Sequence, residues 1–456
     1  MATEEMGAEN EFGRRDIILG VGAAMLTAAV GSKPANAARA AAKSGSDAER
    51  WISTWVAATI STLETTKTFG IPAREFSNQT LRQIIFTSAG GSALRIRVSN
   101  RLGTKPLVLG RASFGVTAKP NGIDVSLVKD RIKPITFGGK PSVTVPVGEE
   151  LASDPVTIDI LRHQTIAIDM FFPQGTGPAE NGQAGLTFVA SGDRVGDPIS
   201  DGFSMGDKGQ AMTGGTASYY LRGVDVINPV VKDVIVCGAD SLSFGTLSAF
   251  DGPVKWPQLL SRRLHAQYAE QAPSVVQSTL SGCRLLTSGP PSLSILERFE
   301  ADFLSQPGVT KVILFVGFND IALGNFPHTP VWEGRYGPLT IPTLEMMAAG
   351  YTKVVKMAHA RGIKIYGCTI TPGANIVFRD IHFWPEHSDT LRHSLNQWFR
   401  TEGVKIFDGV FDFASAVEHP YNKASFDPSC SSDGVHPSSG GFYVLANTVD
   451  LRRLMA

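Results

Sequence analysis

Two patterns of hydrophobic and polar residues divide the chain. Between residues 51 and 221, apolar and polar residues alternate in short runs, which is typical of β-strands with one buried face. In residues 93–99, leucine, isoleucine and valine alternate with two arginines, so we expect one face of this strand to be buried and the other wet. After residue 230, short apolar runs alternate with longer segments of helical period. The first half is therefore predicted to be β and the second half α/β.

The β half contains turn signals between its strands. Residues 79–88 and 93–99 are joined by Ala89-Gly90-Gly91-Ser92, which predicts a hairpin. Short strands separated by glycine and proline turns predict an all-β sandwich domain over residues 51–222. Residues 191–217 are rich in glycine, serine and aspartate and are expected to connect the two halves. The role of the β half stays open between a carbohydrate site on its exposed face and a purely structural part.

The second half is expected to contain five strands and five helices. The strands are predicted at Val234–Cys237, Ser274–Gln277, Lys311–Val316, Lys364–Ile370 and Val404–Phe407. The helices are predicted at Val254–His265, Ser292–Leu304, Leu344–Arg361, His387–Arg400 and Ser439–Leu451. Such alternation predicts a parallel sheet with helices on both faces, and hence a three-layer α/β/α domain over residues 230–456.

The first residues resemble an export signal. Arg14 and Arg15 precede an apolar run from Ile17 to Val30, and Ala35-Asn36-Ala37 has the small-x-small pattern of a cleavage site. Residues 1–37 are thus expected to be a signal peptide of the twin-arginine type, and residues 38–50 a flexible lead-in. The alternative is a single amphipathic or membrane-anchoring helix. Export predicts a periplasmic or secreted protein, and the mature chain contains no further segment that could span a membrane.

The charge balance limits the classes of partner. Lys+Arg and Asp+Glu both number 42, so the formal net charge is zero. A neutral chain gives no reason to expect a nucleic acid or an anionic membrane surface as partner.

Four cysteines would meet an oxidising compartment after export. Cys237 and Cys368 lie in apolar strand patterns and are expected to be buried. Cys283 and Cys430 flank the motifs described next. Whether these two form a disulfide or stay as unpaired thiols is left open.

Polar residues follow several of the predicted strands. Ser241 comes after the first strand and a turn of small residues, which makes it a candidate nucleophile. The other three blocks are Thr279–Leu285, Gly317-Phe-Asn319-Asp320 and Asp433-Gly-Val-His436-Pro437. A separate Gly202-Phe-Ser204-Met-Gly206 fits the G-x-S-x-G pattern, but it lacks the strand before and the helix after that this motif needs. We interpret Ser204 as a chance match.

The four blocks together resemble those of the SGNH/GDSL hydrolases, whose domain is of the three-layer, flavodoxin-like kind. The resemblance covers residues 230–452. It implies that Ser241 is the nucleophile, that Asp433 and His436 complete the triad, and that Ser241, Gly282 and Asn319 form the oxyanion hole. The block that is usually Gly-Asp-Ser reads Ala239-Asp240-Ser241, with the glycine displaced to Gly238. Trp51–Trp55, Asn78–Gln83 and Val98–Asn100 are similar to the domain that precedes the hydrolase in a subgroup of secreted GDSL-type esterases.

The resemblance implies a serine esterase that needs no metal or cofactor. His436 would take the serine proton and Asp433 would hold the imidazole, while three fixed donors would stabilise the oxyanion. The expected substrate is a small-molecule or saccharide ester with a short acyl group. Two other readings stay open: acyl transfer to a sugar hydroxyl at the same site, and a catalytically weak carbohydrate-binding protein. The sequence does not determine the oligomeric state.

Overall fold

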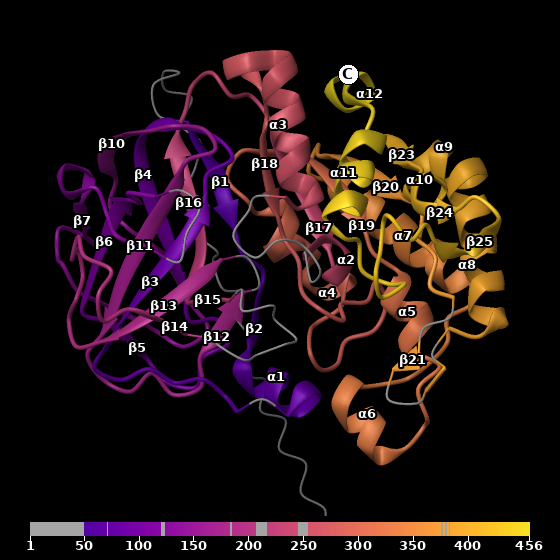
Figure 1. The fold of residues 1–456 in the computed structure, drawn as a ribbon, viewed down its shortest axis with the longest axis horizontal. Helices are drawn as coiled ribbons and strands as arrows, with labels where there is room; N and C mark the ends of the chain where they lie inside the picture. The colour runs from indigo at the N-terminus through magenta and orange to yellow at the C-terminus, as the bar shows by residue number, and fades with distance from the viewer. Residues whose placement is uncertain are drawn as a thin grey trace, which may run out of the picture. The chain divides into compact units, whose positions relative to one another are not determined.

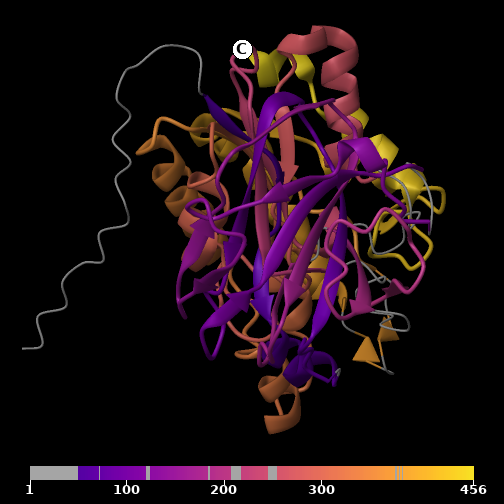
Figure 2. The same ribbon diagram turned by 90° about the vertical axis from the view of Figure 1, so that its left-hand side faces the viewer.

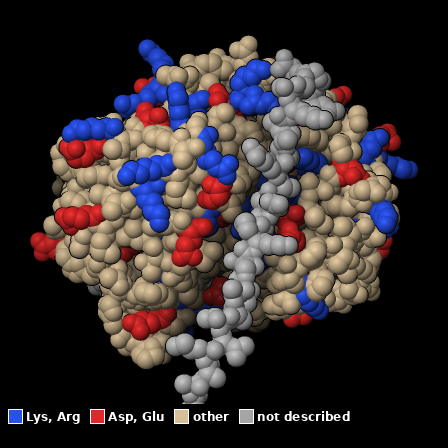
Figure 3. All heavy atoms as spheres, turned by 180° about the vertical axis from the view of Figure 1, so that it is seen from behind, with Lys and Arg blue, Asp and Glu red and all other residues tan. Residues whose placement is uncertain are grey.

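The computed structural model describes residues 50–70, 72–119, 124–182, 185–206, 217–244, 254–374, 377–378, 381–382 and 384–456. The expected signal peptide and lead-in therefore lie outside the described residues, apart from Arg50. Among the described residues, no helix is both long enough and apolar enough to cross a membrane. Lysine, arginine, aspartate and glutamate side chains are interspersed on the face shown in Figure 3, as expected for a chain of zero formal net charge.

The first half of the described chain is built on two larger antiparallel sheets (Figures 1 and 2). In the first sheet the strand order is β1 (Trp51–Val56), β16 (Leu221–Ile227), β4 (Gly91–Ser99) and β10 (Val156–Ile160), with β9 (Glu150–Ala152) also paired to β4. In the second it is β14 (Ser204–Met205), β13 (Leu186–Ser191), β3 (Gln79–Phe86), β11 (Thr165–Phe172), β6 (Arg111–Val116) and β7 (Lys133–Ile135). Smaller sheets join β15 (Ser218–Tyr219), β12 (Glu180–Gly182) and β2 (Thr59–Ser61), and β5 (Leu107–Leu109) with β8 (Val143–Val145). We call residues 50–227 the β-region.

The predicted hairpin between residues 79–88 and 93–99 is wrong. β3 pairs with β11 and β13, whereas β4 belongs to the other sheet. The linking residues are held by β1: the Ser88 N–H donates to the Thr54 carbonyl (3.0 Å), and the Ala89 N–H donates to Thr54 Oγ1 (2.9 Å). These bonds direct the chain from one sheet to the next. The β-region also contains an unexpected helix, α1 (Thr62–Phe69), whose first turn is capped by the Ser61 hydroxyl.

The second half contains the predicted parallel sheet. Its strand order is β18 (Ser274–Gln277), β17 (Val234–Ala239), β19 (Val309–Phe315), β20 (Lys364–Cys368) and β23 (Gly409–Phe411). Numbered along the chain this order is 2-1-3-4-5, the flavodoxin-like order. The mixed α/β architecture expected for this half is thus confirmed.

Helices complete the layers, and their contacts follow from the strand order. The helices α3 (Trp256–Tyr268) and α11 (Ser439–Thr448) pack together, as do α4 (Ile295–Phe299), α7 (Leu344–His359) and α8 (Glu386–Trp398) (Figure 1). Shorter helices are α2 (Ser241–Phe244), α5 (Phe318–Leu323), α6 (Pro330–Tyr336), α9 (Val404–Ile406), α10 (Phe413–Val417) and α12 (Leu451–Met455). Small antiparallel pairs are β21 (Val377–Phe378) with β22 (Ile381–His382), and β24 (Glu418–His419) with β25 (Asn422–Phe426).

The last strand was predicted in the wrong place. Residues 404–407 were expected to be extended, but Val404–Ile406 is helical and the Phe407 N–H donates to the Gly403 carbonyl (2.9 Å). Val404 is exposed, whereas a central strand of a parallel sheet would bury it. A short run with apolar residues at 404, 406 and 407 fits the two-residue period of a strand and also the 3.6-residue period of a helix. The strand β23 forms only after Asp408.

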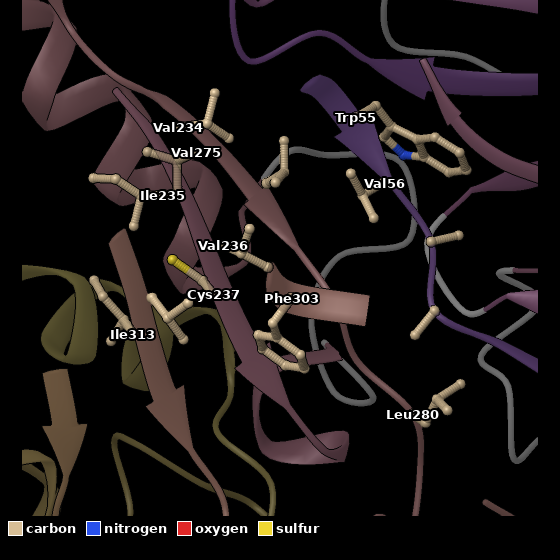
Figure 4. Packing of buried hydrophobic residues seen from close by; sticks show 14 of the residues in the cluster. Trp55, Val56, Val234, Ile235, Val236, Cys237, Val275, Leu280, Phe303 and Ile313 are labelled. Atoms are coloured by element: carbon tan, nitrogen blue, oxygen red, sulfur yellow. The ribbon is translucent and has the colours of Figure 1, made fainter. Parts of the chain in front are cut away.

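The β-region and the parallel sheet share one hydrophobic core. Trp55 and Val56 of β1 belong to the same buried cluster as Val236 and Val275 of the parallel sheet (Figure 4). Backbone bonds join the same parts: the Ser53 N–H donates to the Pro307 carbonyl (2.9 Å). The described residues from 50 onward accordingly form one compact unit. The sandwich form of the β-region and the boundary at residues 222–230 remain predictions.

A buried ionic network crosses the same junction. Asp302, in a π-helical turn after α4, accepts from Arg222 of β16 (2.6 Å) and from Arg298 of α4 (2.8 Å). Arg97 of β4 pairs with Glu150 (3.2 Å) and donates to Gln306 Oε1 (2.8 Å). The arginine face of β4 was predicted to be wet, and at Arg97 this is wrong because the side chain lies against the α/β half, only 8% exposed.

We expect Asp302→Ala to destabilise the protein strongly. Burial acts to raise the pKa of Asp302, but the guanidiniums of Arg222 and Arg298 hold it below its ordinary value. Without this carboxylate, the buried guanidiniums of Arg222 and Arg298 lose the anion that offsets their charge. We expect the free energy of unfolding to fall by about 3–5 kcal/mol. Denaturant unfolding measures the loss. The matched control is Asp193→Ala, which breaks a surface pair with Arg111 and should cost about 0–1 kcal/mol. Equal costs in the two variants would contradict this account of the junction.

Candidate active site

Ser241 begins α2, directly after the carboxyl end of β17. The turn requires glycine at position 238, where φ is 110° and an added Cβ would lie 2.6 Å from Thr279 Cγ2. Ala239 belongs to β17 and pairs with Phe315 of β19. The glycine missing from the usual motif position is therefore supplied one residue earlier, at Gly238, which fits the displacement expected from the sequence.

Ser241, His436 and Asp433 form a hydrogen-bonded series. His436 Nε2 lies 3.1 Å from Ser241 Oγ, and His436 Nδ1 lies 2.8 Å from Asp433 Oδ2. Because an ionised carboxylate only accepts hydrogen bonds, His436 carries its proton on Nδ1 and donates it in a hydrogen bond to Asp433. The unprotonated Nε2 can then accept from the serine hydroxyl. A histidine in this tautomer can take a proton from Ser241.

Asp433 is fixed by its own turn. Its Oδ1 accepts from the N–H groups of Val435 and His436, both at 2.8 Å, and from the Ser431 hydroxyl at 3.2 Å. Partial burial acts to raise the pKa of Asp433, but the imidazole of His436 and the backbone donors hold it at about 2. The carboxylate is thus ionised across the neutral pH range. Its Oδ1 accepts the backbone N–H groups, so its Oδ2 can accept the hydrogen bond from the imidazole.

Asn319 connects three of the predicted blocks. Its Nδ2 donates to Asp240 Oδ2 (3.2 Å) and to the carbonyl oxygen of Cys283 (3.1 Å). Asp240 precedes Ser241, and Cys283 follows Gly282, which has a φ of 70°. The amide therefore lies among the residues expected to form the oxyanion hole. In this structure, however, both of its hydrogens are already directed to protein oxygens, a detail that no sequence motif indicates.

Two buried carboxylates support these blocks. Asp240 accepts from the Leu242 N–H (3.0 Å), and Asp320 accepts from the N–H groups of Leu285 (2.7 Å) and Leu286 (3.0 Å). Burial raises the pKa of Asp240 to about 7, with a further increase from nearby Asp320, and burial raises the pKa of Asp320 to about 6. Neither residue was assigned a role from the sequence, although Asp240 directly precedes Ser241 and Asp320 directly follows Asn319.

The disulfide considered between Cys283 and Cys430 is not formed, since all four cysteines are free and buried. The Cys283 sulfur instead accepts from the Arg298 guanidinium (3.3 Å). This contact ties the block that contains Gly282 to the ionic network at the junction.

Ser204 lies apart from this arrangement. It is exposed in the two-residue strand β14, which pairs with β13, and a turn rather than a strand precedes it. A nucleophile elbow needs a strand before the serine and a helix after it. The local structure fits the interpretation of Ser204 as a chance match.

The strand order of the parallel sheet and the series of Ser241, His436 and Asp433 are together typical of one class of enzyme fold. A 2-1-3-4-5 parallel sheet with Ser241 after its first strand, and with histidine and aspartate just before α11, has the architecture of the SGNH hydrolase fold. Residues 240–442 match the sequence profile of the GDSL-like Lipase/Acylhydrolase family. The C-terminal region of the chain is a GDSL-like lipase/acylhydrolase domain, as the resemblance predicted. The match of this region to the family indicates hydrolase or esterase activity.

Three solved structures of lipases and esterases resemble part of the chain at low sequence identity. A GDSL-like lipase from Bacteroides thetaiotaomicron is 16% identical, with 49% of this chain and 88% of that chain covered and a TM-score of 0.33. An acetyl xylan esterase is 16% identical, with coverages of 47% and 96% and a TM-score of 0.34. A carbohydrate acetylesterase from Sinorhizobium meliloti is 16% identical, with coverages of 47% and 95% and a TM-score of 0.35. No curated protein sequence matches the chain.

The raised pKa of Asp240 gives a prediction for stability. Between about pH 4 and pH 7 the unfolded chain has lost this proton while the folded protein retains it, so the folded state binds more protons and loses stability as pH rises. Asparagine does not titrate, so the stability of Asp240→Asn relative to wild type should increase from pH 4 to pH 7 and then level off. The slope should be on the order of 1 kcal/mol per pH unit.

The contrasting variant is Asp433→Asn, because the pKa of Asp433 is lowered. The stability that this carboxylate contributes is present above about pH 4 and is lost between about pH 4 and pH 2. Denaturant midpoints over this pH range compare the two variants with wild type. A pH-independent difference for Asp240→Asn would contradict the assignment of a protonated Asp240 in the folded protein.

Proposed function

We propose that the chain is an exported serine esterase that hydrolyses carboxylic esters, with a short acyl group or an acetylated carbohydrate as substrate. The observation that carries the proposal is the hydrogen-bonded series of Ser241, His436 and Asp433 at the edge of the parallel sheet. Export rests on the pattern of residues 1–37 alone. No metal or cofactor enters the reaction that we propose.

In the first half of the reaction, Ser241 Oγ attacks the ester carbonyl while its proton moves to His436 Nε2. The imidazolium that forms is stabilised by Asp433, which is ionised and 2.8 Å from Nδ1. The tetrahedral intermediate then expels the alcohol, which takes its proton from Nε2. The product of this half is an acyl-enzyme on Ser241.

The second half repeats the proton transfers with water. His436 Nε2 takes a proton from water, the hydroxide oxygen attacks the acyl carbon, and the Ser241 oxygen leaves with the proton from Nε2. The carboxylic acid is released and the free serine is regenerated. A sugar hydroxyl in place of water would give the acyltransferase alternative, so product analysis with an added sugar distinguishes the two.

The proposed oxyanion hole consists of the N–H groups of Ser241 and Gly282 and the amide of Asn319. The bonds that Asn319 makes to Asp240 and Cys283 fix the amide before the substrate arrives, which is the condition for effective electrostatic stabilisation. The oxyanion would then share one of these N–H groups with Asp240 or Cys283.

A fluorophosphonate probe tests the nucleophile. We expect a single covalent adduct on Ser241, located by mass spectrometry, because among the serines that the structure describes only Ser241 has an imidazole acceptor aligned by a carboxylate. His436→Ala should lose the labelling, whereas Ser204→Ala should keep it. An adduct on Ser204, or no adduct on folded protein, would exclude the proposed mechanism.

Asn319→Ala tests the oxyanion hole. Loss of one such donor lowers kcat by about 10²–10³. Asn325→Ala is a matched control, since Asn325 also donates from a helix terminus, to the Ile321 carbonyl (3.0 Å) and the Ser388 hydroxyl (2.8 Å), and we assign it no part in the reaction. Thermal unfolding verifies that both variants fold. Near-normal turnover in Asn319→Ala would remove the residue from the hole.

A further inference from the structure

A pocket of about 430 Å³ lies where the β-region meets the loop that contains Gly282. We call it the junction pocket. Among its lining residues, Ile60, Glu64 and Arg101 come from the β-region, and Leu280, Pro291 and Ser292 come from the α/β half. Its volume lies in the range of about 300–1,000 Å³ that is typical of small-molecule sites.

The junction pocket adjoins the candidate active site. Pro291 of its wall packs on Gly282, so closely that a Cβ added to Gly282 would lie 3.1 Å from Pro291 Cδ. Leu280, also in the wall, accepts a hydrogen bond from the N–H of Cys283 (3.2 Å), whose carbonyl accepts from Asn319. The pocket and the proposed oxyanion hole therefore share the loop of residues 280–283.

The walls of the junction pocket combine aliphatic surface with polar groups. Besides aliphatic side chains and prolines, two cations and two anions line it, Arg101 and Arg298 with Glu64 and Asp302. Arg101 lies 3.7 Å from Asp302, a distance too long for a hydrogen bond, and its side chain is 35% exposed. Ser292 also belongs to the lining, but it is only 8% exposed and its Oγ is a buried atom, so we give this hydroxyl no part in binding.

These groups select among three kinds of ligand. A long acyl chain would cover Arg101 and the Glu64–Lys67 ion pair (2.6 Å) with hydrocarbon, and removing these charges from water without new hydrogen bonds is costly. An anion would face two carboxylates as well as two guanidiniums, so the charge balance gives it no advantage. A neutral polyhydroxylated molecule can donate to Glu64 and accept from Arg101, while its C–H faces lie on the aliphatic walls.

We propose that the junction pocket binds the sugar portion of an acetylated carbohydrate and so places its ester at Ser241. This inference rests on the proposed esterase function. It assigns the β-region one wall of the substrate site and gives Arg101 and Glu64 a role in specificity.

The test compares two substrates, 4-nitrophenyl acetate and a methyl glucoside with a single acetyl group. The measured quantity is the ratio of kcat/KM for the sugar ester to kcat/KM for the 4-nitrophenyl ester. Arg101→Ala and Glu64→Gln each remove a charge-assisted hydrogen bond to the sugar, so each should lower this ratio about tenfold or more. Leu102→Trp, which fills the pocket without removing a charge, should lower it as well.

Arg111→Ala is the matched control. Arg111 is also an arginine of the β-region paired with an aspartate, but it lies outside the junction pocket and should leave the ratio within about twofold of wild type. An unchanged ratio in all three pocket variants would overturn the inference. So would a wild-type enzyme that hydrolyses 4-nitrophenyl acetate but not the sugar ester. With 4-nitrophenyl octanoate as a third substrate, a loss confined to that ester in the pocket variants would make the pocket an acyl site and would also overturn the inference. Failure of the esterase function itself gives a different result. The wild type would then hydrolyse neither of the two acetate esters and would not react with the fluorophosphonate.

Discussion

The pairing of Asp302 with two arginines from different halves of the molecule is the constraint on which the arrangement of the site depends. Arg222 comes from the last strand of the β-region, and Arg298 from the helix that follows the Gly282 loop. All three groups are buried, so each needs the others to offset the loss of water. Because Arg298 also donates to the Cys283 sulfur, the same ionic contact that fixes the β-region holds the loop beside the candidate nucleophile.

Within the site, the buried carboxyl of Asp240 holds neighbouring residues in place, as Asp302 does at the junction. Asp240 accepts from Asn319 and from the first turn of the helix that begins with Ser241. Its raised pKa shows that burying this carboxyl is unfavourable for the charged form, and Arg298 offsets part of that effect. The protein thus tolerates a destabilising carboxyl where it aligns two of the residues proposed for catalysis, a common compromise at functional sites.

The sequence was most informative where one physical rule dominates. The parallel strands at residues 234, 274, 311 and 364 could be predicted because a strand buried on both faces is a continuous apolar run. The convergence of Ser241, Asn319 and His436 follows from loops at one edge of such a sheet. The hairpin at residues 89–92 failed because the Ser88 and Ala89 N–H groups bond to Thr54, a distant residue that no local pattern indicates. The strand at residues 404–407 failed because its short apolar run fits a helical period as well as a strand period.

The buried face of β4 shows most clearly what the sequence alone could not reveal. Arginines alternating with aliphatic residues ordinarily indicate a strand with a solvated face, yet Arg97 faces Glu150 and Gln306 at the junction. An arginine is buried only where another part of the chain supplies acceptors, and here these come in part from the α/β half. Part of the polar face of β4 thus meets the α/β half, beside the apolar residues of β1 that share its core. A β-region attached in this way is suited to form a rigid wall beside the site, because its position is fixed by paired charges as well as by the shared core.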